Sequence, residues 1–297
     1  DDALVGLGDI DALFGEAGED RLIGGPGTGI GIEGLIGGPG DDHLDGGPGL
    51  DAVHYFDAPG SVHVDLGAGV ATGHGSDRIV DVEGAGGSNF DDLLVGDEGG
   101  NGLFGQDGAD TIRGLGSGDF TSGTYDVLSG DDGADLILGG AGDDVASYGR
   151  ILSAVTVDLA AGTATGQGRD SLTGVEGVFG SRFDDVLLGD AGDNLFAGGT
   201  GDDRINGRAG RDTLSLTDVP GPVTVDLAAG QATGAGVDIL GGIENAWGSS
   251  HADILIGDQR RNELFGFAGD DRLFGGPGDD LLAGGDGPDH ADGGAGS

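Results

Sequence analysis

A nine-residue pattern recurs along almost the whole 297-residue chain and limits the fold more than any other feature. It reads Gly-Gly-x-Gly-x-Asp-x-U-x, where U is a large aliphatic residue. Clear copies are GGPGDDHLD, GGTGDDRIN and GGPGDDLLA, which begin at Gly37, Gly198 and Gly275. A fixed short period is typical of a solenoid, in which each repeat buries its apolar side chain against its neighbours. We therefore expect glycine-rich turns that alternate with short x-U-x strands. Helices are not expected, because glycine interrupts every window of about ten residues.

The composition favours turns that carry negative charge. The 72 glycines supply the positive φ angles that tight turns require. The 54 acidic residues outnumber the 12 basic ones, and the formal net charge is −42. Such a charge disfavours nucleic acid and anionic membranes as partners and indicates a hard cation as the missing component. No apolar run approaches about 18 residues, so membrane insertion is not expected. The absence of cysteine excludes disulfides and thiolate metal sites.

The nonapeptides fall into four arrays separated by three less regular spacers. The arrays cover residues 6–53, 87–147, 180–215 and 248–292, and the spacers cover 54–86, 148–179 and 216–247. Both ends of the chain fall inside a repeat, at Asp1 to Val5 and Gly293 to Ser297, so we expect the sequence to be a segment of a longer protein, or one processed or trimmed at its ends.

The spacers repeat one another as well. Each contains the sequence VxVDL, beginning at Val62, Val155 and Val223, and its alternation predicts a half-buried strand. Each also contains a degenerate nonapeptide, such as TGHGSDRIV from Thr72 to Val80, preceded by nearly two repeat lengths. We therefore interpret the spacers as modified, wider coils and predict one continuous solenoid over residues 1–297. As register breaks rather than flexible linkers, they should resist proteolysis in calcium.

The chemistry of the turn suits calcium. Calcium prefers about six to eight oxygen ligands in a tolerant geometry. Three glycines can direct backbone carbonyls inward and the aspartate adds a carboxylate, but one turn offers too few oxygens. Two turns stacked 18 residues apart could complete the shell, which would make metal binding and coil stacking the same event. We therefore expect calcium to drive folding.

These residues resemble the RTX, or haemolysin-type, calcium-binding repeat family, and the likeness extends over nearly the entire chain. The resemblance implies an all-β fold, a right-handed parallel β-roll with multiple Ca²⁺ ions in its turns. It also implies that the sixth-position aspartates are the metal ligands. These are Asp11, Asp20, Asp42, Asp51, Asp92, Asp110, Asp126, Asp135, Asp144, Asp185, Asp203, Asp212, Asp253, Asp271, Asp280 and Asp289, together with Asp77, Asp170 and Asp238 in the spacers.

Some turns depart from the pattern. The nonapeptide that begins at Gly24 has Gly29 in place of the aspartate. Three others have asparagine there, at Asn101, Asn194 and Asn262, with aspartate at the second position instead. Either the charge has moved within these turns, or they are free of metal and asparagine acts as a turn former. Asp11 has Asp9 where glycine is usual, so Asp11→Ala should matter less than Asp203→Ala.

The sequence favours a non-catalytic, calcium-binding extracellular module that forms a calcium-stabilised rod, as a structural, adhesin, surface-layer or filament component. The alternative is the accessory repeat region of a secreted enzyme whose catalytic domain lies outside these residues. No nucleophile elbow or HExxH motif is present, and the Asp-Asp pairs recur with the repeat, so we expect no enzyme activity. Export to a calcium-rich exterior or cell surface follows from the resemblance, and self-assembly or cell-surface contacts are left open as further partners.

Overall fold

A computed structural model of the chain describes residues 1–6, 12–25 and 32–296. Among these residues every regular element is a β-strand, and most strands are three residues long. The chain divides into two compact units. The N-terminal unit comprises Asp1–Ser147 and Gln167–Val175, and the C-terminal unit comprises Tyr148–Gly166 and Glu176–Ser297.

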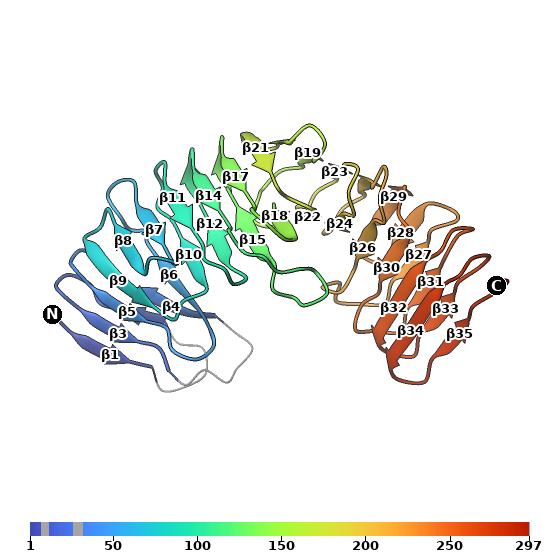
Figure 1. Cartoon of the computed structure of the whole chain (residues 1–297), viewed down its shortest axis with the longest axis horizontal. Helices are drawn as coiled ribbons and strands as arrows, with labels where there is room; N and C mark the ends of the chain where they lie inside the picture. The colour runs from blue at the N-terminus through green and yellow to red at the C-terminus, as the bar shows by residue number, and fades with distance from the viewer. Residues whose placement is uncertain (7–11, 26–31, 297) are drawn as a thin grey trace. The chain divides into compact units, whose positions relative to one another are not determined.

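The N-terminal unit is built from two main sheets (Figure 1). In pairing order, the first sheet contains β1 (Ala3–Val5), β3 (Arg21–Ile23), β5 (His43–Asp45), β9 (Ser76–Val80), β8 (Val70–Thr72), β7 (His63–Asp65), β11 (Leu93–Val95), β14 (Thr111–Arg113), β17 (Leu136–Leu138) and β21 (Arg169–Thr173). The second contains β2 (Ala12–Phe14), β4 (Ile32–Ile36), β6 (Leu50–His54), β10 (Gly84–Gly86), β12 (Gly102–Phe104), β15 (Asp126–Ser129) and β18 (Asp144–Ser147). A small separate pair joins β13 (Asp107–Gly108) to β16 (Asp132–Gly133).

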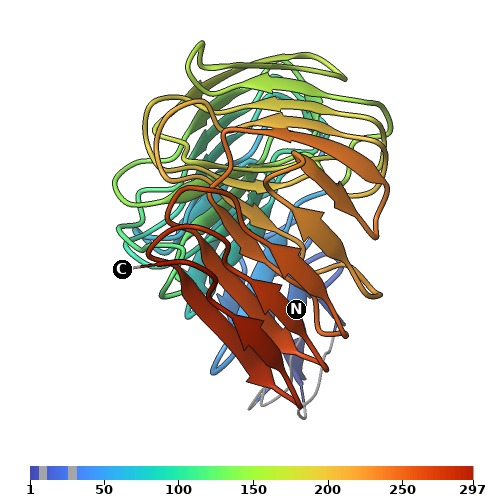
Figure 2. The same cartoon turned by 90° about the vertical axis from the view of Figure 1, so that its right-hand side faces the viewer.

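The C-terminal unit has the same construction (Figures 1 and 2). Its first sheet contains β20 (Thr163–Thr165), β19 (Thr156–Asp158), β23 (Val186–Leu188), β25 (Arg204–Asn206), β29 (Val237–Gly241), β28 (Gln231–Thr233), β27 (Thr224–Asp226), β31 (Ile254–Ile256), β33 (Arg272–Phe274) and β35 (His290–Asp292). Its second contains β22 (Gly177–Phe179), β24 (Leu195–Ala197), β26 (Thr213–Ser215), β30 (Asn245–Trp247), β32 (Glu263–Ala268) and β34 (Leu281–Asp286).

The strands of the arrays are the x-U-x segments of the nonapeptides. In β5, for example, Leu44 at the eighth position is fully buried while His43 and Asp45 on either side are half-buried. Each such strand pairs in parallel with the strand one coil away, as β23 does with β25. Burying one large aliphatic side chain stabilises the fold by about 1.5–3 kcal/mol, and a stack of them forms the core between the sheets. The expected all-β, parallel β-roll is confirmed.

The spacers differ from a purely parallel roll because they insert antiparallel strands. In the first spacer the chain runs through β7, β8 and β9, which lie side by side, and both pairings are antiparallel (Figure 1). The reversal has a local cause: the Asp65 carboxylate accepts the N–H of Ala68 at 2.7 Å, and Gly69 takes a φ of 69°. The third spacer repeats this arrangement with β27, β28 and β29.

The VxVDL strand is half-buried, as its alternation predicts. Val62 and Val64 are buried and His63 is exposed, and the corresponding valines at 223 and 225 are also buried. Each of these two spacers adds three strands to one sheet but a single strand, β10 or β30, to the other. At the spacing of neighbouring strands, two extra strands make one sheet about 10 Å longer than the other within the spacer.

Candidate metal-binding turns

The sixth-position aspartates lie in the turns that lead into the strands or in the first two residues of the strands, and nearly all of those described are buried. Asp11 lies outside the described residues. Of the remaining predicted ligands, Asp280 is half-buried and Asp289 is exposed. The buried ones are Asp20, Asp42, Asp51, Asp77, Asp92, Asp110, Asp126, Asp135, Asp144, Asp170, Asp185, Asp203, Asp212, Asp238, Asp253 and Asp271. Burial of so many carboxylates in one fold requires compensation, because an isolated buried charge is very costly.

One oxygen of these carboxylates holds adjacent coils together. Oδ1 of Asp203 accepts the backbone N–H of Asp185 at 2.8 Å, and Asp185 occupies the same position 18 residues earlier. Asp110 does the same for Asp92 at 2.8 Å. The spacer aspartates join the same ladders, since Asp238 accepts the N–H of Asp203 at 3.1 Å. The sixth position therefore has a structural role in coil stacking that does not depend on a metal.

The other oxygen has no protein partner in many of these turns. Oδ2 is buried and accepts no hydrogen bond in the turns of the following aspartates, which we call open turns: Asp20, Asp42, Asp110, Asp135, Asp203, Asp212, Asp271 and Asp280. A buried acceptor without a donor is unusual in folded proteins and indicates a missing cation or donor.

A carbonyl oxygen from the next coil approaches the same point. A Cβ built on Gly105, the first residue of its turn, would collide with Oδ2 of Asp110 and lie 2.8 Å from the carbonyl oxygen of Gly130. A Cβ on Gly266 would likewise meet Oδ2 of Asp271 and lie 2.6 Å from the carbonyl oxygen of Gly284. A side chain at the first position would thus fill a cradle in which carboxylate and carbonyl oxygens of two stacked turns converge.

Burial raises the pKa of several of these carboxyls far above their ordinary value. The pKa of Asp110 rises to about 8 and those of Asp135 and Asp203 to about 7, chiefly because burial removes water from the charged form. The neighbouring carboxylates in the ladder add to the rise, as Asp135 does for Asp110. In the absence of a cation these groups favour the protonated form, so a bound cation would also displace protons.

The donor set fits a hard cation that uses backbone oxygens. Among residues 1–6, 12–25 and 32–296, no group of three or more His, Asp or Glu side chains gathers at one point. Side chains alone therefore do not form a complete shell there, and open turns such as those of Asp110 and Asp271 contribute one carboxylate oxygen beside a carbonyl oxygen. Calcium accepts this mixture of ligands, whereas zinc prefers nitrogen and sulfur.

Other turns satisfy the carboxylate with donors of the protein itself. After each spacer, a serine at the second position bonds the sixth-position aspartate. Ser181 donates its N–H to Oδ2 of Asp185 at 2.6 Å and its hydroxyl to Oδ1 at 2.8 Å. Ser88 and Ser249 make the same bonds to Asp92 and Asp253. These predicted ligands therefore differ from those of the open turns, a distinction that the sequence analysis did not make.

The asparagine turns are also closed by hydrogen bonds. Oδ1 of Asn194 accepts the N–H of Asp190 at 2.9 Å, while Nδ2 donates to the carbonyl oxygen of Glu176 at 3.2 Å and to Oδ1 of Asp190 at 3.4 Å. Asn101 and Asn262 make the equivalent three bonds. Of the two alternatives, this geometry supports asparagine as a turn former, because its amide group makes the contacts that a cation would otherwise make.

The sequence analysis missed the spacer glutamates as members of the ladders. Oε2 of Glu83 accepts the N–H of Asp51 at 3.0 Å, and Oε2 of Glu244 accepts the N–H of Asp212 at 3.0 Å. Each glutamate precedes a second-sheet strand, where the arrays have aspartate. Burial raises the pKa of Glu83, and the charge of nearby Asp97 adds to the rise. Their common offset in the three aligned spacers was the signal that could have identified them.

Comparison with known families agrees with this geometry. The family model for the RTX calcium-binding nonapeptide repeat matches residues 1–30, 28–55, 122–150, 179–214, 247–282 and 274–297, together more than half of the chain. The chain belongs to this RTX repeat family. A search of curated proteins finds no significant match to the chain. The RTX chain is thus a calcium-binding repeat module, and its repeat is a structural rather than a catalytic element. None of its described residues form a helix long and apolar enough to cross a membrane.

Proposed function

We propose that this chain is a non-catalytic extracellular module whose β-roll folds and is held by several calcium ions, as part of a structural, adhesin, surface-layer or filament protein. The open turns carry this proposal. Each offers a buried carboxylate oxygen without a donor, and in the turns of Asp20, Asp110, Asp212 and Asp271 a carbonyl oxygen of the following coil lies next to it. A divalent cation at that point satisfies both oxygens and joins two coils.

Charge makes the dependence on calcium strong. The net charge of −42 opposes compaction, and the ladders bring carboxylates of successive coils together. At millimolar calcium and a Kd of about 0.1 mM, one independent site stabilises the folded state by about 1.4 kcal/mol. Several such sites together are comparable to the whole stability of a domain. Weak sites of this kind suit a calcium-rich exterior, where RTX proteins typically act.

Calcium titration of the metal-stripped chain tests the proposal. Circular dichroism should show little strand signal before calcium and a cooperative gain during the titration, and calorimetry should show several ions bound. Magnesium at the same concentration should not substitute, because it demands a stricter octahedral geometry. A compact, β-rich chain in calcium-free buffer would contradict the proposal.

The continuity of the solenoid over residues 1–297 stays a prediction. Limited proteolysis in saturating calcium tests it at the second spacer, residues 148–179. A continuous solenoid should be cut no faster there than in the arrays, whereas preferential cutting there would identify a linker.

A further inference from the structure

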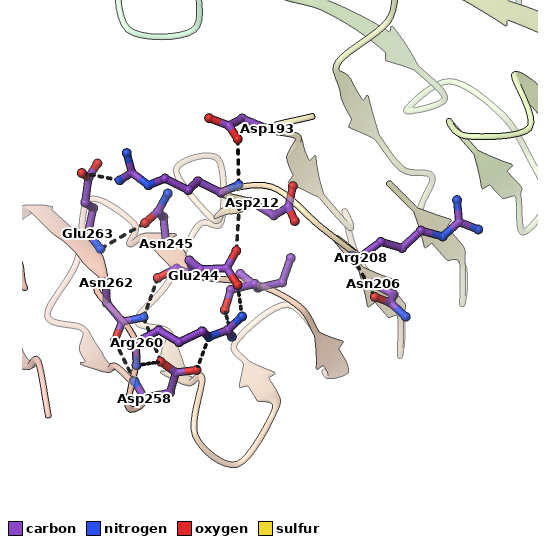
Figure 3. Close-up of polar contacts among 12 residues, drawn as sticks. Asp193, Asn206, Arg208, Asp212, Glu244, Asn245, Asp258, Arg260, Asn262 and Glu263 are labelled. Atoms are coloured by element: carbon purple, nitrogen blue, oxygen red, sulfur yellow. Dashed lines mark hydrogen bonds and ion pairs between the residues drawn. The ribbon is translucent and has the colours of Figure 1, made fainter. Parts of the chain in front are cut away.

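The last of the three asparagine turns contains an arginine among its acidic groups. Figure 3 shows Arg260 beside Glu244, Asp258 and Asn262. Nε of Arg260 donates to Oδ2 of Asp258 at 2.8 Å, Nη1 donates to Oε1 of Glu244, and Nη2 donates to the carbonyl oxygen of Ile243 at 3.0 Å. One guanidinium therefore joins two carboxylates and a backbone carbonyl.

These acceptors come from two successive coils. Glu244 and Ile243 precede β30, whereas Asp258 belongs to the turn that leads into β32, the strand paired with β30. The side chains of Glu244 and Asp258 are only 10% and 13% exposed, and that of Arg260 is 44% exposed. The guanidinium thus covers two nearly buried carboxylates on their solvent side.

The two sister turns provide a matched comparison. The bonds of Asn101 and Asn194 are the same as those of Asn262. At the fourth position the sister turns have Gly99 and Gly192 where the third has Arg260, and all three donate a backbone N–H to the second-position aspartate at 2.7 Å. The arginine was therefore added to an otherwise conserved hydrogen-bond pattern.

The backbone at this position accepts a side chain. Except in the Asp135 turn, the fourth-position glycines of the open turns have positive φ angles, such as 125° at Gly201 and 152° at Gly278. Gly99, Gly192 and Arg260 do not have positive φ angles. A Cβ added to Gly192 would meet no atom closer than Oδ1 of Asp190 at 3.3 Å.

We propose that Arg260 is an internal cation that neutralises Glu244 and Asp258 and so joins the turns of Glu244 and Asn262 without calcium. The guanidinium supplies a permanent positive charge to a carboxylate–carboxylate–carbonyl set from two stacked coils. This junction therefore forms at lower calcium than the open turns do. The inference rests on the proposed calcium-dependent folding.

Local hydrogen exchange during a calcium titration of the full chain tests this role. The readout is the calcium concentration at which the amides of residues 258–263 become half-protected. Arg260→Gln should raise this concentration roughly two- to fivefold, the range expected for a partly exposed charge pair. Arg260→Gly, which recreates the sister turns, should raise it similarly.

Two further variants separate charge compensation from a general effect. Arg261→Gln changes the net charge equally at the adjacent residue, which bonds Glu263 on the strand at 3.0 Å, and should leave the half-protection concentration unchanged. Glu244→Gln combined with Arg260→Gln should return it toward the wild-type value, because the glutamine oxygen can still accept the N–H of Asp212. Equal effects of Arg260→Gln and Arg261→Gln, or no recovery in the double variant, would overturn the inference.

The same variants distinguish failure of this inference from failure of the proposed function. If the wild-type chain is fully protected in calcium-free buffer, the proposed calcium dependence is wrong, and the inference about Arg260 is overturned with it. If the wild-type chain needs calcium but Arg260→Gln matches Arg261→Gln, only the role of Arg260 is wrong.

Discussion

The adjacent turns of Asn194 and Asp203 differ in how the side-chain oxygen beside the first-position glycine is satisfied. In the Asp203 turn, Oδ2 is buried without a donor, and burial raises the pKa of the carboxyl to about 7. In the Asn194 turn the corresponding oxygen, Oδ1 of Asn194, accepts the N–H of Asp190 at 2.9 Å, and the amide NH₂ bonds Glu176 and Asp190. The oxygen that lacks a donor in the Asp203 turn therefore has a backbone donor in the Asn194 turn, which closes itself.

Self-closed turns come directly after the spacers, and open turns follow them along the chain. Ser181 closes the first array turn after the second spacer, and Asn194 closes the next turn. The following turns, of Asp203 and Asp212, are open. The same order of serine, asparagine and open aspartate follows the third spacer, at Ser249, Asn262 and Asp271. Protein donors thus close the first turns after each spacer, and the turns without such donors come later in the array.

The largest expected difference between the two kinds of turn is at the fourth-position glycine. Gly201→Ala in the Asp203 turn should destabilise the C-terminal unit by at least about 1–3 kcal/mol, because φ is 125° and the new Cβ would lie 2.6 Å from the carbonyl carbon of Phe183. Gly192→Ala in the Asn194 turn should cost less than about 1 kcal/mol. Urea unfolding in saturating calcium measures both free energies. Similar losses of unfolding free energy in Gly201→Ala and Gly192→Ala would mean that the two turns do not differ in backbone geometry at the fourth position.

The second test removes the open carboxylate itself. Asp203→Asn should abolish ligation at its cradle and weaken the adjacent coil, lowering the stability in millimolar calcium by about 1–2 kcal/mol. Asp202→Asn is the control, because Asp202 is exposed and its oxygen only accepts the N–H of Val237 at 2.9 Å. Calorimetry should show fewer ions bound by Asp203→Asn and an unchanged number for Asp202→Asn. An equal loss of ions in both variants would indicate that overall charge, rather than the cradle, controls binding.

The sequence predicted the local structure of the arrays better than that of the spacers. The period determines which residue of a nonapeptide is buried and which lies in the turn, so Leu44 and Asp42 were placed correctly. In each spacer, a segment of nearly two repeat lengths precedes the degenerate nonapeptide, and its length alone predicted one wider coil of the same roll. The Asx-type turn at Asp65 instead reverses the chain, so that β7 and β8 pair antiparallel. Strand order depends on these long-range pairings, which a period does not encode.

The candidate sites could be predicted only in part, because their contacts also depend on long-range pairing. The motif located the aspartates but could not distinguish Asp185, which Ser181 bonds, from Asp203, whose Oδ2 has no donor. It also gave no reason to connect Glu244 with Arg260, 16 residues away. Partners of a buried carboxylate come from neighbouring coils, so they emerge only once the stacking register is known.

The pH dependence should reveal the open turns in solution. The ordinary aspartate pKa is 3.8, and burial raises it to about 8 in Asp110 and to about 6 in Asp42. At a pH between the ordinary pKa and the raised pKa, the carboxyl is protonated in the folded chain and ionised in the unfolded chain. Calcium-free stability should therefore rise as the pH falls from about 8 to 4 and be lost as the pH rises again. Calcium competes with these protons, so its apparent affinity should be lower at pH 6 than at pH 8. Circular dichroism of the metal-stripped chain and calorimetry at both pH values measure the two trends, and calcium affinity independent of pH would contradict them.

The smallest expected effect concerns a turn closed by a hydroxyl. Tyr55 is buried and donates its hydroxyl to Oδ2 of Asp77 in the first spacer at 2.8 Å. The third spacer has Leu216 at the aligned position, and there burial raises the pKa of Asp238 to about 6. Tyr55→Phe should therefore give Asp77 an open carboxylate oxygen and cost about 1 kcal/mol at low calcium.

Calcium provides the means to separate this effect from a packing defect. Phenylalanine preserves the ring, so the loss in Tyr55→Phe should shrink as calcium rises and a cation replaces the missing donor beside Asp77. Thermal unfolding of the variant and the wild type at several calcium concentrations measures this convergence. A loss of stability that is the same at low and saturating calcium would mean that the hydroxyl contributes an ordinary buried hydrogen bond and that the first spacer does not share the chemistry of the open turns.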